Sequence, residues 1–281
     1  MTVALQPTTV KEALRQHTQI KLSDTPLLDC QILLAFVLQQ SRTWLYAHDD
    51  YQLTCVETQR YQILLDSRTA GKPVAYITGI QEFWSLDFHV TQDTLIPRPE
   101  TELIVETLLN RYTESQATVI DLGTGAGPIA ISLAYERPEF NIFASDKSLS
   151  ALQIARSNDQ QLNESPVHFV QSDWLEPFKS GQFDIIVCNP PYVDPEDSHL
   201  KLLKYEPADS LVSGNSGMKD IERITCSSPA YLKPGGMILL EHGYNQQFAV
   251  QQLLKHSGYT DVEPLSDLSG QARAVLAYKP L

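Results

Sequence analysis

Four apolar runs of strand length, each followed by a polar or glycine-rich loop, most constrain the fold of this 281-residue chain. Their content of Val, Ile and Phe is typical of strands buried on both faces of a parallel sheet. The runs are residues 118–121, 141–145, 167–170 and 183–188. Because helical segments alternate with strands from residue 118 onward, we expect an α/β fold whose four loops meet at the carboxyl edge of the sheet. Open α/β sheets bind their ligands at that edge.

The loop after the first run is Gly123-Thr124-Gly125-Ala126-Gly127, and a helix is predicted over residues 128–137. Glycine permits a tight turn and lets a ligand approach the backbone closely. The spacing differs from the Gly-x-Gly-x-x-Gly of dinucleotide loops, and no Gly-Lys-Ser/Thr follows. A pyrophosphate or triphosphate ligand is therefore not favoured.

Two further loops carry candidate ligand-binding side chains. Asp146 follows Gly127 by 19 residues, close to the roughly 20 residues at which nucleotide-binding folds place a ribose-binding carboxylate. The third run leads into Ser172-Asp173-Trp174, where the indole could flank an adenine and the carboxylate could accept from its amino group. The alternatives are a helix cap for Asp146 and a core position for Trp174.

The fourth run ends in Asn189-Pro190-Pro191-Tyr192. Proline has no backbone N–H, so this strand end presents carbonyl acceptors, to which Asn189 adds an amide and Tyr192 an aromatic face. A planar group with an NH2 could donate to Asn189 and Pro190 while it packs against the ring of Tyr192. The alternative is a turn, since Asn and Pro are common turn residues.

The N-terminal region predicts a small helical bundle, because its apolar residues recur at helical spacing from Thr8 to about Ala70. The expected helices begin at Thr25-Pro26, include Leu45 and Tyr46, and cover residues 56–65.

An alternating aromatic pattern follows residue 73 and predicts a hairpin of two strands, 74–79 and 83–90. Residues 96–102 are either a stiff linker or part of the site, with a helix beyond. We therefore expect an N-terminal domain (1–73), a β-hairpin linker (74–95) and an α/β domain (96–281).

The remainder of the chain predicts a long polar loop over 193–219, whose length suggests that it covers the site. Helices are expected over 220–232 and 248–257, and strands over 237–241 and 274–278, the last of which closes the sheet. His242 follows a strand but is interpreted as structural or solvent-facing, not as a general base.

Composition excludes several classes. The formal net charge is −13, whereas proteins that grip nucleic-acid backbones usually carry a basic surplus. The four cysteines form no Cys-x-x-Cys pair and the histidines show no ligand spacing, so no metal site is expected. Residues 1–6 lack the pattern of a leader, and no run is long enough to span a membrane. We expect a cytoplasmic protein.

With these motifs in this order, the chain resembles the class I S-adenosylmethionine-dependent methyltransferases. Within them it closely resembles the release-factor glutamine methyltransferases, the HemK/PrmC group. The resemblance covers nearly the whole chain, and its most specific blocks are residues 71–79, 82–84, 95–102 and 270–273. It implies a Rossmann-like seven-stranded domain that methylates the amide nitrogen (N5) of the glutamine in the Gly-Gly-Gln motif of peptide chain release factors.

The resemblance also implies the roles of individual residues. S-adenosylmethionine would bind at Gly123, Thr124, Gly125, Ala126, Gly127, Asp146, Ser172, Asp173, Trp174 and Asn189. The glutamine would bind at Asn189, Pro190, Pro191 and Tyr192, of which Asn189, Pro190 and Tyr192 would be catalytic. The helical domain would dock the release factor, and the protein is expected to act as a monomer without direct contact to nucleic acid or membrane.

Three rival functions remain open from the sequence. A nucleic-acid amino-group methyltransferase, acting on adenine or guanine, shares the Asn-Pro-Pro-Tyr motif but predicts a basic groove. A non-enzymatic protein could bind S-adenosylmethionine or release factor without turnover. An NAD-dependent oxidoreductase is disfavoured by the glycine spacing.

Overall fold

The structure, a computed structural model, describes residues 8–163 and 165–281. The contacts within the chain divide it into two units, between Ile80 and Gln81. Residues 1–6, on which the expectation of no leader rests, lie outside the described residues.

The first unit is helical, as predicted. Its helices begin at strong caps: Thr9 and Glu12 form a capping box at α1, and Thr54 and Glu57 form another at α4, so the exposed N–H groups of both first turns are satisfied. Apolar residues from all the longer helices share one core. The helices are α1 (Val10–Arg15), α2 (Pro26–Leu38), α3 (Arg42–Ala47), α4 (Cys55–Thr69) and α5 (Val74–Thr78).

The prediction of a strand over residues 74–79 is wrong, because these residues form α5. Pro73 stands at the N-cap of α5, and Gly79 ends it with φ +79°. Proline favours the start of a helix and glycine its end. Over only five residues, apolar spacing does not distinguish a helix from a strand.

The hairpin exists but is displaced along the chain. It pairs β1 (Ile80–Phe83) with β2 (Leu86–His89), and it turns at Trp84 and Ser85, whose φ angles are +54° and +58°. Positive φ at both central residues is the geometry of tight hairpin turns.

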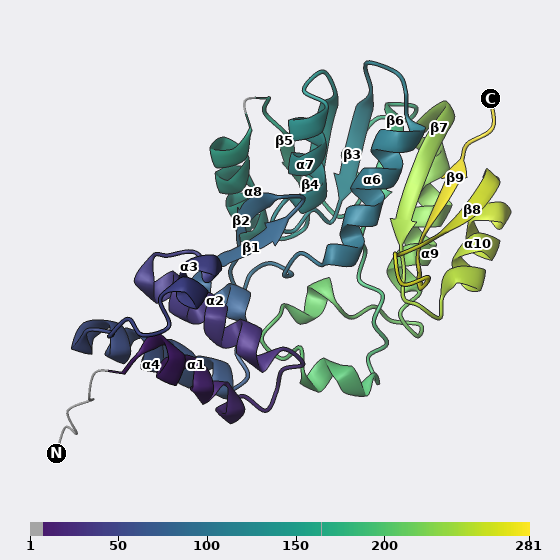
Figure 1. The fold of residues 1–281 in the computed structure, drawn as a ribbon. Helices are drawn as coiled ribbons and strands as arrows, with labels where there is room; N and C mark the ends of the chain where they lie inside the picture. Colours follow the sequence, from purple (N-terminus) through teal and green to yellow (C-terminus); the bar gives the residue numbers. More distant parts are fainter. Residues whose placement is uncertain (1–7, 164) are drawn as a thin grey trace. The chain divides into compact units, whose positions relative to one another are not determined.

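The second unit is built on one mixed sheet (Figure 1). Within the described residues seven strands pair in the order β5-β4-β3-β6-β7-β9-β8, and β9 is antiparallel to both neighbours. This confirms the predicted α/β class and the four parallel strands. The strands are β3 (Thr118–Leu122), β4 (Asn141–Asp146), β5 (His168–Gln171), β6 (Phe183–Cys188), β7 (Leu232–Glu241), β8 (Thr260–Ser266) and β9 (Ala272–Tyr278).

Alternate residues of the central strands face two separate cores. In β3, Val119 belongs to the core under α6 and α7, whereas Ile120 belongs to the core under α9 and α10. Phe83 and Phe88 of the hairpin join the first core. Burial on both faces explains the continuous apolar runs in the sequence. The helices are α6 (Glu102–Arg111), α7 (Pro128–Glu136), α8 (Leu149–Leu162), α9 (Lys219–Ser227) and α10 (Gln247–His256).

Two late predictions need correction. Residues 274–278 do not close the sheet: β9 lies inside it, and β8, which we did not predict, forms the edge. The sequence of β8 is polar and contains Pro264, which an edge strand tolerates. The helix predicted over 220–232 ends at Ser227, since Pro229 follows and Leu232 already begins β7.

Candidate functional site

A cavity of about 480 Å3 lies at the carboxyl ends of β3, β4, β5 and β6. It therefore lies at the predicted edge of the sheet. Of the residues predicted to bind a ligand, eight line it: Gly123, Gly125, Asp146, Ser172, Asp173, Trp174, Asn189 and Pro191.

The glycine loop places backbone, not side chains, on the cavity wall. Gly127 stands at the N-cap of α7 with φ +89°, and a Cβ there would lie 2.5 Å from Cδ1 of Ile131. A side chain at this position would therefore force the side chain of Ile131 to move, and the positive φ would strain the backbone as well. Thr124 and Ala126 are buried behind the wall, and the Thr124 hydroxyl donates to Asp121 at 2.6 Å.

Asp146 braces the glycine loop from the end of β4. Its carboxylate accepts from the backbone N–H of Gly125 at 2.9 Å and from that of Ser148 at 2.8 Å. The capping alternative is thus partly right, although the cap of α8 itself is the Ser148 hydroxyl. Each carboxylate oxygen retains a lone pair for a ligand.

The loop after β5 brings Trp174 over the first glycine. A Cβ on Gly123 would lie 3.4 Å from the indole, and the half-buried Trp174 lines the cavity. Asp173 is already paired, since Arg223 Nη1 donates to both of its carboxylate oxygens, at 2.8 and 2.7 Å. Arg223 of α9 also lines the cavity, a role that its helical position gave no reason to expect.

The Asn-Pro-Pro-Tyr segment begins where β6 ends. The Asn189 amide donates from Nδ2 to the Thr101 hydroxyl at 3.0 Å, and the Tyr192 hydroxyl donates to Glu241 at 3.1 Å. Asn189 and Pro191 face the cavity, whereas Pro190 and Tyr192 are not part of its wall. Burial raises the pKa of Tyr192 well above its usual range, and the nearby Glu241 carboxylate adds to this shift.

Glu241 and Asp121 are buried carboxyl groups close to this edge. Burial raises the pKa of each to about 7, against the opposing effect of the hydroxyl groups that donate to them. We did not single out either residue from the sequence. The sequence did hold one indication of Glu241, which is a carboxylate at the end of the apolar run 237–241. Because β7 ends at the same edge of the sheet as the other parallel strands, this carboxylate could have been assigned to the site.

The polar loop after Tyr192 covers part of the cavity, as predicted, and three of its residues line the wall: Asp209, Ser210 and Val212. Glu206 fastens this loop to residues 96–98, because it accepts from Arg98 Nη2 at 2.6 Å and from the Ile96 N–H at 3.1 Å. Together with Thr101, these contacts make the segment 96–102 part of the site's framework. His242 is buried and its Nδ1 lies 2.8 Å from the Gly243 carbonyl.

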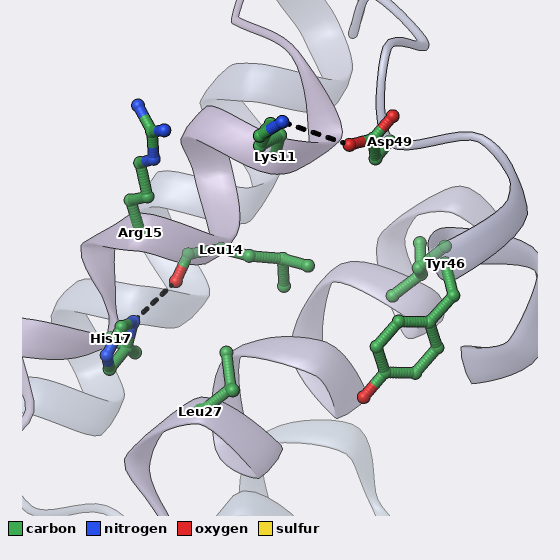
Figure 2. A pocket seen from close by; sticks show the side chains of 8 residues that line it. Lys11, Leu14, Arg15, His17, Leu27, Tyr46 and Asp49 are labelled. Atoms are coloured by element: carbon green, nitrogen blue, oxygen red, sulfur yellow. Dashed lines mark hydrogen bonds and ion pairs between the residues drawn. The ribbon is translucent and has the colours of Figure 1, made fainter.

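The first unit has a smaller hollow of about 260 Å3, shown in Figure 2. Leu14 and Leu27 supply apolar side chains to it, Lys11 pairs with Asp49 at 3.4 Å, and His17 contacts a backbone carbonyl at 2.9 Å. These groups bind one another and suggest no reaction. In the described part of the chain no cluster of His, Cys, Asp or Glu could hold a metal ion, and no helix could cross a membrane.

Comparison with known proteins gives two family matches. The PrmC N-terminal domain matches residues 9–79, and the methyltransferase small domain matches residues 99–205. Among solved structures, a methyltransferase from Pyrococcus furiosus aligns with a TM-score of 0.55 at 17% identity, over 80% of this chain and 99% of that one. This likeness supports the methyltransferase fold.

Curated relatives match along almost their whole length. The release factor glutamine methyltransferase of Escherichia coli K12 is 42% identical over 261 residues, which are 92% of this chain and 94% of that protein. The enzyme of the same name from Coxiella burnetii is 39% identical over 271 residues, 95% and 98% of the two chains. The chain belongs to the family of release factor glutamine methyltransferases.

Proposed function

We propose that this protein transfers a methyl group from S-adenosylmethionine to the side-chain amide nitrogen (N5) of the glutamine in the Gly-Gly-Gln motif of peptide chain release factors. The family supports the reaction. The observation that carries the proposal for this chain is the position of Asn189, which shares one cavity wall with the glycine loop and Asp146.

The residues around the cavity fit S-adenosylmethionine. A volume of about 480 Å3 suits a ligand of this size, and Gly123 and Gly125 leave room along the wall. Asp146 would accept a hydrogen bond from the ribose, and Trp174 would offer a flat apolar face to the adenine. Thr124, Ala126 and Gly127 shape the loop from behind, while Ser172 and Asp173 would lie on the adenine side. When bound, the sulfonium supplies a methyl group on an activated leaving group.

The chain's own residues hold and orient the nucleophile. An amide nitrogen is a poor nucleophile because its lone pair is delocalised into the carbonyl. Hydrogen bonds from the substrate NH2 to Oδ1 of Asn189 and to the Pro190 carbonyl fix the direction of the nitrogen and stabilise the positive charge that develops on it. Pro191 and Tyr192 limit the space available to the amide plane.

The alternative, methylation of an adenine or guanine amino group in nucleic acid, is not favoured by the relatives. The net charge of −13 also opposes it, since such enzymes neutralise backbone phosphates with basic residues.

The proposed function predicts that purified protein transfers labelled methyl from S-adenosylmethionine to a release factor, and that a release factor with the motif glutamine changed to alanine receives none. Transfer is measured by label in the intact factor beside a reaction with bulk nucleic acid. Label in the nucleic acid, or equal label in the glutamine-to-alanine factor, would contradict the proposal.

We also propose that the N-terminal domain, 1–73, docks the release factor and that residues 74–95, which hold α5 and the β1–β2 hairpin, link it to the methyltransferase domain. A glutamine side chain occupies little of the surface that a folded protein offers, so further contacts are expected to add affinity. A short peptide with the Gly-Gly-Gln loop should therefore show a KM about 100-fold or more above that of the intact factor. Equal KM values would remove the need for a docking surface.

A further inference from the structure

Four side chains form a continuous series of hydrogen bonds that begins at Asn189. Nδ2 of Asn189 donates to Oγ1 of Thr101 at 3.0 Å, and the Thr101 hydroxyl donates to Oε2 of Glu241 at 2.8 Å. Tyr192 donates to the other oxygen of the same carboxylate at 3.1 Å. Thr101 and Glu241 are each only 2% exposed. Water therefore has little access to them, and breaking either hydrogen bond would leave a buried polar group without a partner.

The carboxylate of Glu241 determines which atom donates in each hydrogen bond of this series. An ionised carboxylate only accepts hydrogen bonds, so the single hydrogen of Thr101 must point at Glu241. Oγ1 can then only accept from Asn189, which means that the amide must present its NH2 to Thr101. The amide oxygen Oδ1 consequently points away from Thr101. The opposite amide orientation would set Oδ1 against an oxygen that has no hydrogen left to donate.

We propose that Thr101 and Glu241 are positioning residues that fix the amide orientation of Asn189, so that an acceptor and not a donor faces the substrate NH2. This inference rests on the proposed function, because only a substrate that donates from nitrogen needs Oδ1 at that place. A flipped amide would present NH2 to NH2 and could not hold the nucleophile.

The surroundings of Glu241 make this orientation sensitive to pH. The charged and titratable groups around it are Tyr192, Glu100 and Arg273, together with the Cys188 thiol on the neighbouring strand. Burial raises the pKa of Glu241 to about 7. Below that pH the acid carries a hydrogen of its own, and the chain of bonds loses its single direction.

The first test replaces Thr101. Thr101→Val keeps the shape of the side chain and removes the hydroxyl, so kcat for release-factor methylation should fall about tenfold or more while the Kd for S-adenosylmethionine changes little. Thr101→Ser keeps the hydroxyl and should restore most of kcat. The matched control is Thr225→Val, which removes an equally buried hydroxyl bonded within α9 and should leave kcat unchanged.

The second test follows kcat from pH 6 to pH 8. A required carboxylate with a pKa of about 7 predicts a rise of about tenfold in the wild type, and Glu241→Gln should abolish the rise. Asp121 has a similar pKa and remains intact in this variant, so a rise that survives would overturn the role of Glu241. Wild-type kcat in Thr101→Val would overturn that of Thr101. Absence of methyl transfer by the wild type itself would instead refute the proposed function.

Discussion

Asn189→Ala is expected to lower kcat for release-factor methylation by about 10²–10³-fold, the cost of removing one preorganised polar group from a reacting centre. The variant loses Oδ1, which we propose as one of two acceptors for the substrate NH2. Pro190 retains its carbonyl, and a single hydrogen bond leaves the amide free to rotate away from the methyl group. The measurement is single-turnover transfer of labelled methyl at saturating release factor.

The affinity of this variant for S-adenosylmethionine separates catalysis from cofactor binding. The glycine loop, Asp146 and Trp174 remain in place, so the Kd from calorimetry should stay within about tenfold of the wild-type value. The matched control is Asn141→Ala, since Asn141 is exposed at the other end of a parallel strand and should be neutral in both assays. Turnover near the wild-type rate in Asn189→Ala would refute the catalytic assignment.

The part of the site that could be predicted from the sequence depends on strand ends. The strands β3, β4 and β6 lie inside the sheet, so their sequences are largely continuous apolar runs, whereas β5 lies at an edge of the sheet and is only partly buried. The residues that follow all four runs lie at the carboxyl ends of the strands. Asp146, Trp174 and Asn189 were therefore placed together correctly, although they are far apart in the chain. The polar loop after Tyr192 was recognisable as a cover by its length alone.

The elements that were missed carry weak local signals. The five residues of α5 alternate as readily as a strand does, and only the caps Pro73 and Gly79 distinguish the two. The edge strand β8 is half polar and contains a proline, so nothing in its sequence resembles the buried strands. Such segments take their structure from tertiary pairing, which a local pattern does not contain.

The partners behind the site could not be predicted because they arise from packing between distant segments. Thr101 and Glu241 are 140 residues apart, and Arg223 approaches Asp173 across 50 residues. Each residue is unremarkable within its own segment. Their roles become visible only when hydrogen-bond directions are followed atom by atom.

Of the glycine-to-alanine substitutions near the site, Gly217→Ala is expected to disturb the structure most, because its added Cβ makes the shortest contact. Its Cβ would lie 2.1 Å from the carbonyl oxygen of Tyr192 and 2.7 Å from Nε2 of Gln246. Gln246 donates to that same carbonyl at 3.0 Å, so the methyl group would clash with both partners of this hydrogen bond. The obstructed atom belongs to the backbone, so either the loop that carries Gly217 or the carbonyl of Tyr192 must shift, and we expect the shift to reach the Asn-Pro-Pro-Tyr segment.

A displacement of about 1 Å at a reacting group can cost about 10²-fold in rate, and we expect a loss of this size in kcat. Gly217 also has φ +82°, where alanine costs about 1–2 kcal/mol whatever the space around it. Gly181→Ala is the matched control, because Gly181 has φ +65° and a Cβ there meets nothing within 4 Å. Thermal unfolding should show a moderate loss of stability in Gly181→Ala with normal kcat, and losses of both in Gly217→Ala. If the two variants were equally active, contact with Tyr192 would not matter, and the position of the Asn-Pro-Pro-Tyr segment would be set by the sheet and the Thr101–Glu241 chain alone.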